Sequence, residues 1–352
     1  MKNLFFLMLG LCFSILLVTN CTNEATSENS GGTGKSAGDK TAITDGTVSF
    51  NMVYVPGGLT TPTGVTDATS ATVADAYEIT ETEVTFELWS AVYIWATGDA
   101  NMDGTITGGE VAGAYNFSNI GTMGDNGART NQHPVTTINW RDAMVWANAL
   151  TEYLNNKNGT SLTPVYYSDG DSSYATVHRD SRDSGACAAA ATSVTAGQCD
   201  NPDLKADATG FRLPTADEWE LAARYKGSDS SSGAIEKPTS SGKWWTPGNY
   251  ASGATSNYTD AVATGLVSWY LVNSGSATHE VATTTKAANL LGLADMSGNV
   301  YEWTFDWNSA TMRKVHGGCY ALGDAILQVG SVNGMNPYFE TSVTGFRVAI
   351  SK

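Results

Sequence analysis

Helical periodicity is confined to the part of the chain before Tyr225, and this constrains the fold more than any other feature. Apolar residues recur at helical spacing over 84–96 and 139–156. A third predicted helix follows Thr215, which can cap the first turn together with Glu218 three residues on. After Tyr225 the pattern stops, and Gly, Trp and Tyr separate short strand-like runs. We therefore predict an α+β fold with few helices, short antiparallel strands and many loops.

Alternating apolar residues predict strands at both ends of this region. Residues 48–55 alternate and stop at a Pro-Gly-Gly turn, 77–79 form a shorter run, and 345–350 alternate up to the end of the chain. We expect 345–350 to be one strand that closes a sheet. A long polar insertion, 158–210, separates the second predicted helix from the third.

The first residues have the pattern of an export signal. Lys2 precedes an apolar run over 4–18, which is short for a membrane span but suits a secretory signal. Residues 17–21 resemble a bacterial lipoprotein box, which implies a signal peptide over 1–20 and a lipid on Cys21. Residues 21–46 are then the lipidated end and a flexible tether, and 47–352 the folded domain. The alternative is an ordinary signal peptide with an incidental cysteine.

Charge and cysteine content fit an exported protein and exclude one class of partner. With 35 acidic and 19 basic residues the formal net charge is −16, which excludes a nucleic-acid binder that neutralises phosphates. We expect a location in the bacterial cell envelope, on the outer surface, with membrane contact through the lipid alone. Cys187 and Cys199 bracket a loop of small residues, and outside the cytoplasm this favours a disulfide over a metal site. Cys319 then has no partner.

Residues 99–110 match the twelve-residue calcium loop at its diagnostic positions. Gly104 occupies the position of the sharp turn that lets both halves of such a loop surround the ion. The predicted ligands are Asp99, Asn101, Asp103, Thr105 and Glu110. A closed cage of oxygen atoms offers nothing to a substrate, so we expect the calcium to be structural. The alternative is an Asp-, Asn- and Gly-rich surface turn.

Several blocks of sequence carry a family resemblance. The most specific is 210–220, which reads Gly-Phe-Arg-Leu-Pro-Thr-Ala-Asp-Glu-Trp-Glu, and 52–58, 133–143, 298–303 and 345–348 add to it in order. On these residues the chain resembles the formylglycine-generating-enzyme, or sulfatase-modifying-factor, family, whose fold is a variant of the C-type lectin fold. The resemblance places calcium ligands at Asp295, Gly298 (backbone), Val300 (backbone) and Glu302.

The same resemblance speaks against oxidase activity. The two cysteines that family oxidases use would fall on Leu322 and Leu327, and neither side chain can be a thiolate or hold copper. A lone Cys319 is more often a packed small residue than a nucleophile. We therefore expect a protein that is not an enzyme. A family enzyme acting through other residues and a structural protein of the cell envelope are the alternatives.

The segment 319–344 lies between a Gly-Gly pair and the terminal 345–348 block and has no consistent period. This layout resembles the variable region of proteins diversified by retroelements, in which a lectin-like frame displays randomised residues. The resemblance implies a macromolecular ligand, such as a host or bacterial surface protein or glycan. The predicted displayed residues are Tyr320, Ala321, Leu322, Asp324, Ile326, Leu327, Val332, Gly334, Met335, Tyr338, Phe339, Thr341, Ser342 and Val343. Large aromatic and flexible polar side chains are also the mixture that antibody paratopes use. The base of this surface could be lined by three nearby aromatic residues, Tyr301, Trp303 and Trp307. The alternative is that such aromatics fill the core.

Overall fold

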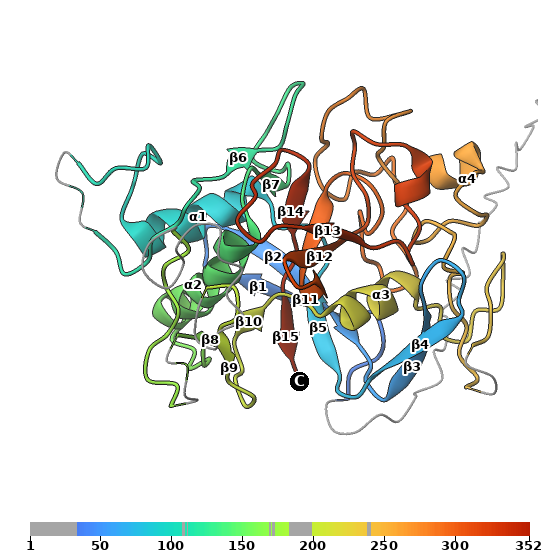
Figure 1. Ribbon diagram of the computed structural model, residues 1–352, viewed down its shortest axis with the longest axis horizontal. Helices are drawn as coiled ribbons and strands as arrows, with labels where there is room; N and C mark the ends of the chain where they lie inside the picture. Colours follow the sequence, from blue (N-terminus) through green and yellow to red (C-terminus); the bar gives the residue numbers. More distant parts are fainter. Residues whose placement is uncertain are drawn as a thin grey trace, which may run out of the picture.

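The computed structural model (Figure 1) describes residues 34–107, 110, 112–168, 170, 173–182, 199–237 and 241–352. The predicted signal peptide, Cys21 and Cys187 lie outside the described residues. In the part of the chain that is described, no helix has both the length and the apolar character that a membrane span requires.

Four α-helices and one 3₁₀ turn are present in the described residues. The helices are α1 (Phe86–Thr97), α2 (Trp140–Asn158), α3 (Ala216–Arg224), α4 (Ala261–Gly265) and the 3₁₀ turn η2 (Asp324–Ile326). The first three confirm the helices predicted from periodicity. The short α4 was not predicted, because five residues are too few to show a helical repeat.

Short strands form two larger sheets and three hairpin-like pairs. One sheet has the order β1-β2-β5-β15-β10 and the other the order β13-β12-β11-β14. Their strands are β1 (Lys40–Thr44), β2 (Ser49–Val55), β5 (Tyr77–Thr80), β10 (Phe211–Arg212), β11 (Tyr301–Ser309), β12 (Met312–His316), β13 (Asn333–Met335), β14 (Thr344–Phe346) and β15 (Ala349–Ser351). The pairs join β3 (Leu59–Thr63) to β4 (Thr69–Val73), β6 (Thr122–Met123) to β7 (Val135–Thr136), and β8 (Tyr166–Tyr167) to β9 (Asp203–Leu204). In Figure 1, α1 and α2 lie on one side of the central strands and α3 on the other.

Local capping chemistry fixes where the longer helices begin. The Thr215 hydroxyl accepts from the Glu218 amide at 3.1 Å and the Glu218 carboxylate accepts from the Thr215 amide at 2.8 Å, which is the predicted capping box of α3. Asn139 and Asp142 form a second capping box at the start of α2. At the end of α1, Gly98 takes a left-handed conformation (φ 79°) that ends the helix.

Buried tryptophans build the frame. Trp89 and Trp146 stack at 5.8 Å between ring centroids, and Phe346 meets Trp146 edge-on at 5.3 Å. The fully buried tryptophans are Trp89, Trp140, Trp146, Trp219, Trp245 and Trp303. Trp89, Trp140, Trp146 and Trp303 belong to the largest core cluster and Trp219 and Trp245 to a second one, so the tryptophan content is largely structural.

The end of the chain differs from the single strand predicted over 345–350. Residues 344–346 form β14, which pairs in parallel with β11, whereas 349–351 form β15, which pairs with β5 and β10 in the other sheet. Arg347 lies between them and is fully buried. Its side chain reaches Glu302, so the chain turns from one sheet to the other around an ion pair.

The folded domain also begins earlier than predicted. Lys40–Thr44 pairs along its whole length with β2, so the predicted tether cannot extend to Gly46 and must end before Lys40. Just before this strand, the Lys35 ammonium pairs with Glu78, and the Lys352 ammonium pairs with the same carboxylate at 2.8 Å. One buried carboxylate therefore holds both ends of the domain together.

Candidate ligand-binding surface and buried polar centre

The backbone of the 319–344 segment is held by the frame along its length. Near its start the Tyr320 amide donates to the Asn299 carbonyl at 2.8 Å, and in its middle β13 pairs with β12. Near its end the Tyr301 amide donates to the Val343 carbonyl at 2.8 Å. The backbone path is thus fixed by neighbours outside the segment, and side chains that point away from the frame are free to contact a ligand.

Many predicted displayed residues do reach the surface. Leu322, Val332 and Phe339 are 43%, 37% and 56% exposed. The half-buried members of the predicted set are Ala321, Asp324, Ile326, Gly334, Met335, Tyr338, Thr341, Ser342 and Val343. The surface therefore alternates between apolar side chains and groups that can form hydrogen bonds.

Two predicted displayed residues are buried, and for these the prediction is wrong. Leu327 is completely buried against Val267 and Tyr270 in a small core cluster. Tyr320 is 3% exposed, and its hydroxyl donates to the Asp125 carboxylate. Both side chains hold the segment to the frame, and a ligand cannot reach Leu327.

The turn that carries Tyr338 and Phe339 rests on a buried ion pair that sequence reasoning missed. The Phe339 amide donates to the Asn336 carbonyl at 3.0 Å and closes this turn. The centroid of the Tyr338 ring lies 5.6 Å from the Arg141 guanidinium. Arg141 makes a two-pronged pair with Asp200 at 2.7 and 2.8 Å. Asp200 follows the disulfide-bonded Cys199, so the predicted insertion supplies one support of the 319–344 segment.

The aromatic floor proposed from sequence is mostly core. Trp303 is fully buried and Tyr301 is 3% exposed, with its hydroxyl accepting from the Asn333 side-chain amide at 2.9 Å. Trp307 is half-buried, and the Arg313 guanidinium lies 3.8 Å from its ring centroid. The alternative that these rings fill the interior therefore holds for Trp303 and Tyr301.

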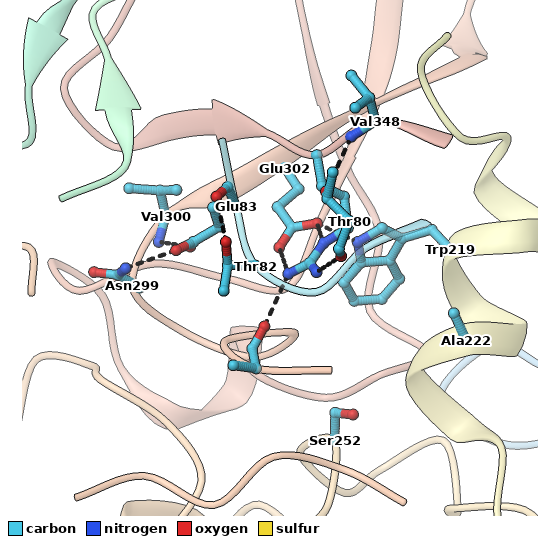
Figure 2. Close-up of polar contacts among 12 residues, drawn as sticks. Thr80, Thr82, Glu83, Trp219, Ala222, Ser252, Asn299, Val300, Glu302 and Val348 are labelled. Carbon is cyan, nitrogen blue, oxygen red and sulfur yellow. Dashed lines mark hydrogen bonds and ion pairs between the residues drawn. The ribbon is translucent and has the colours of Figure 1, made fainter. Parts of the chain in front are cut away.

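The second predicted calcium site lies in a buried polar centre (Figure 2). Arg347 donates to both oxygens of Glu302 at 2.6 Å, and the Trp219 indole N–H donates to one of them at 2.6 Å. Both oxygens of the Glu302 carboxylate therefore already accept hydrogen bonds from Arg347, and one of them also accepts from Trp219. In this arrangement Glu302 binds a guanidinium and is not free to ligate a cation.

Two further carboxylates lie next to this ion pair. Oδ2 of Asp295 accepts from the Ala282 amide at 2.7 Å, while Oδ1 is buried with no hydrogen-bond partner among the described residues. Burial raises the pKa of Asp295 to about 6. Glu83 accepts from the Asn299 side chain at 2.7 Å and from the Val300 amide at 3.2 Å (Figure 2), and burial raises its pKa well above the usual range.

Asp295, a predicted calcium ligand, lies in this buried polar centre, but the predicted ligand set as a whole does not form a complete calcium site. Gly298 (φ 89°) approaches Trp269 so closely that a Cβ would lie 2.3 Å from the Trp269 carbonyl oxygen, which explains the glycine. In the described parts of the chain, no three His, Cys, Asp or Glu side chains are grouped so that they could hold a metal ion. The orphaned Asp295 oxygen suits a cation, whereas the occupied Glu302 does not.

The 99–110 loop is closed by its own carboxylates. Asp99 accepts from the Gly104 amide at 2.8 Å, and Glu110 accepts from the Ala100 amide at 2.8 Å. Asp103 accepts from the Thr105 amide at 2.8 Å. The donor set that would meet a cation here consists of oxygen atoms only, as calcium prefers. Calcium at this loop stays a prediction.

The cysteines differ in state. Cys319 is a buried free thiol whose pKa is raised to about 11 by burial, so it is not a thiolate near neutral pH. Cys199 is disulfide-bonded, as predicted, and its predicted partner Cys187 lies outside the described residues. Leu322 and Leu327, where the family resemblance predicts the oxidase cysteines to fall, lie at the surface and in the core respectively.

The two sheets, few helices and long connecting loops define an α+β domain of the formylglycine-generating type. The family model described as the sulfatase-modifying factor enzyme 1-like domain (FGE-sulfatase) matches residues 42–352. The chain therefore belongs to this family, as its sequence blocks predicted.

Individual proteins resemble the chain to different extents. The structure of Treponema denticola variable protein 1 is 27% identical and covers 89% of this chain and 99% of that one, with a TM-score of 0.59. The crystal structure of CarF is also 27% identical and covers 86% of this chain and 98% of that one, with a TM-score of 0.55. Chaperone protein LppX of Paenibacillus barcinonensis is 29% identical over 192 residues, which are 53% of this chain and 57% of LppX. The chain thus spans little more than half the length of this curated relative.

Proposed function

We propose that this protein is a binding protein of the bacterial cell envelope that recognises a macromolecular ligand through its 319–344 segment and has no oxidase activity. Diversification of the segment by a retroelement and a lipid anchor on Cys21 are parts of the same proposal. The anchor rests on the lipoprotein-like sequence at 17–21. The diversification rests on the layout of the segment and on the similarity to a variable protein over almost that protein's whole length.

One observation carries the binding proposal: the segment has a backbone fixed by the frame and side chains that face outward. Phe339 is the most exposed large apolar side chain of the segment, at 56%, and Tyr338 lies beside it on Arg141. A rigid aromatic pair contributes contact area with little loss of conformational entropy on binding. Specificity would then depend on the outward side chains and stability on the buried ones.

The cysteine chemistry supports a function without catalysis. A family oxidase needs two cysteines, and the corresponding positions hold Leu322 and Leu327. Cys319 is buried and its pKa of about 11 keeps it protonated. Neither a thiolate nor a pair of sulfur ligands is therefore available among these residues.

The binding proposal can be tested with the exported chain carrying Cys21→Ser, which cannot be acylated. A phage-displayed random peptide library is selected on this protein, and recovered clones are measured against Tyr338→Ser/Phe339→Ser. Leu204→Ser is the matched control, because Leu204 is 45% exposed and lies outside the segment. We expect the double substitution to weaken binding at least tenfold and the control to leave it unchanged. Clones that bind all three proteins equally would contradict recognition by the segment.

We also propose structural calcium at the 99–110 loop and, with Asp295, at the buried polar centre. The oxygen donors of the loop and the orphaned Asp295 oxygen support this proposal. At the polar centre, calcium would have to replace Arg347 as the partner of Glu302. The loop is therefore the better candidate, and calcium there would add rigidity at the end of α1.

A further inference from the structure

A group of exposed aliphatic side chains lies outside the predicted ligand-binding segment. Val262 and Val272 are each 75% exposed, and Leu266 and Leu271 are 59% and 52% exposed. With Leu322 of the segment (43%) they form what we call the aliphatic patch. Single exposed apolar residues are normal on protein surfaces, but several that are contiguous indicate an interaction site.

Contacts join the three pieces of chain that carry the patch. Leu266 directly follows α4, and its amide donates to the Val262 carbonyl at 3.1 Å, so the two side chains, four residues apart, lie on the same side of this turn of chain. Gly265, three residues after Val262, flanks the same face and meets the following turn, since a Cβ on it would lie 3.6 Å from the Asn273 side chain. That turn carries Leu271 and Val272.

A backbone hydrogen bond then joins the turn to the ligand-binding segment. The Leu271 amide donates to the Leu322 carbonyl at 3.0 Å. The Ser274 hydroxyl donates to the Tyr320 carbonyl at 2.9 Å, so the turn is fixed to the segment at two points. Figure 1 shows α4 at the edge of the molecule beside the red ribbon of the segment.

A small core lies beneath the patch and holds it in place. Val267, Tyr270 and Leu327 pack together with two alanines in one buried cluster. The Asn273 side chain donates to the Ser268 carbonyl at 2.9 Å and fixes the turn internally. The packed core beneath them leaves no room for the exposed side chains to turn inward. Binding of a partner that covers them is favoured by the burial of their apolar surface, and the loop is already ordered before binding.

The charge around the patch excludes several partners. Lys286 lies against α4, but its ammonium is 3.9 Å from the Trp269 ring centroid and donates to the Gly265 carbonyl. This ammonium is thus directed into the frame, and the whole chain has a formal net charge of −16. An anionic membrane or a polyanion would be repelled, and branched aliphatic chains offer a glycan neither a ring nor a hydrogen bond.

The size of the patch indicates that it forms part of a larger interface. Five side chains at these exposures present on the order of 400 Å², about half of one side of a standard protein–protein interface. Alone this is too small for a stable dimer of the chain. The exposed side chains of the 319–344 segment, such as Val332 and Phe339, add further area to it.

We propose that the aliphatic patch is the constant half of the ligand-binding surface and contacts an apolar stretch of a polypeptide ligand. This proposal rests on the proposed function of the segment, which supplies the other half. The patch would contribute affinity that does not depend on the sequence of the segment, while Phe339 and its neighbours select the ligand. Four of its five members lie outside 319–344, so a change within the segment leaves most of the patch intact.

The test uses the selected peptide clones described above and the exported chain with Cys21→Ser. Leu271→Asp/Val272→Asp places two charges in the patch, and Leu204→Asp is the control, since β9 lies at the opposite end of the molecule from α4 in Figure 1. Thermal melting and circular dichroism establish that each variant is folded, and Val272→Ser alone is the milder variant if the double one is not. We expect clones rich in aliphatic and aromatic residues to bind the patch variant at least tenfold more weakly and the control unchanged.

The outcomes separate this proposal from the function on which it rests. Clones that lose binding to Tyr338→Ser/Phe339→Ser but bind the patch variant normally would overturn the patch and leave the segment as the binding site. Clones that lose binding to the patch variant alone would support the patch and contradict recognition by the segment. Recovery of no peptide from the library would overturn the commitment to a polypeptide ligand.

Discussion

The ion pair between Arg347 and Glu302 offers a sharp test of how the frame is built. Both side chains are completely buried, and Arg347 donates to both Glu302 oxygens at 2.6 Å. Arg347 also donates to the carbonyls of Thr80 at 2.9 Å and Ala294 at 3.0 Å. The guanidinium therefore neutralises one buried carboxylate and connects two sheets and a loop, and Arg347→Met removes all of this at nearly constant volume.

The loss of unfolding free energy caused by Arg347→Met has two parts, one from the ion pair and one from the carbonyls. Removing one partner of a buried ion pair destabilises a protein by roughly 3–5 kcal/mol, because an uncompensated charge remains in the interior. Two buried carbonyls that lose their donor cost about 1 kcal/mol each. Together these give about 6 kcal/mol as the expected loss of unfolding free energy for Arg347→Met, and the added substitution Glu302→Gln should restore about half of this. The amide introduced by Glu302→Gln would carry no charge but could still accept from Trp219.

The measurement is urea unfolding at pH 7 with the disulfide intact, followed by tryptophan fluorescence, for all four members of the double-mutant cycle. The coupling between the two sites should be at least about 2 kcal/mol. A loss below about 1 kcal/mol for Arg347→Met, or a double variant no more stable than that single variant, would refute the reasoning.

Other parts of the structure give three further predictions. Chelation of calcium should lower the melting temperature of the wild-type chain by about 5 °C, and Asp103→Ala should remove this difference in calorimetry. Burial lowers the pKa of His178 to about 4 from an unfolded value of 6.5, so the unfolded state takes up the proton first as the pH falls. The neutral ring contributes stability that is fully present above pH 6.5. Between pH 6.5 and pH 4 the free energy of unfolding should fall by on the order of 1 kcal/mol per pH unit. Urea titrations of His178→Gln should show a smaller slope. Leu327→Ala should cost about 2–4 kcal/mol, whereas Leu322→Ala should cost under about 0.5 kcal/mol.

Each of these predictions has a contradicting result. An unchanged melting temperature in chelator would remove the case for calcium at the 99–110 loop. A pH slope that His178→Gln leaves intact would show that other groups cause the acid sensitivity. Equal losses for the two leucine substitutions would contradict the assignment of Leu327 to the core and Leu322 to the surface.

Features set by local chemistry could be predicted from the sequence. The capping boxes at Asn139 and Thr215 depend on residues three positions apart, so the sequence shows them directly. The break in the terminal strand could not be predicted in this way. It depends on Glu302, which lies 45 residues before Arg347 and attracts its side chain out of the alternating pattern.

The candidate site shows the same division. The resemblance located the 319–344 segment, and its place at the surface agrees with the exposure of Leu322 and Phe339. It could not show that Leu327 is buried, because the residues that cover it, Val267 and Tyr270, come from a distant part of the chain. The exposed Leu271 and Val272 have no sequence signal, since two adjacent apolar residues in a loop are more often buried.

Sequencing this gene in several clonal isolates of the organism that carries it would test the central claim most directly. If the 319–344 segment is a diversified ligand-binding surface, amino-acid differences should be confined to that segment and should concentrate at outward positions such as Leu322 and Phe339. An invariant segment, or differences spread evenly over the chain, would contradict diversified recognition by this surface.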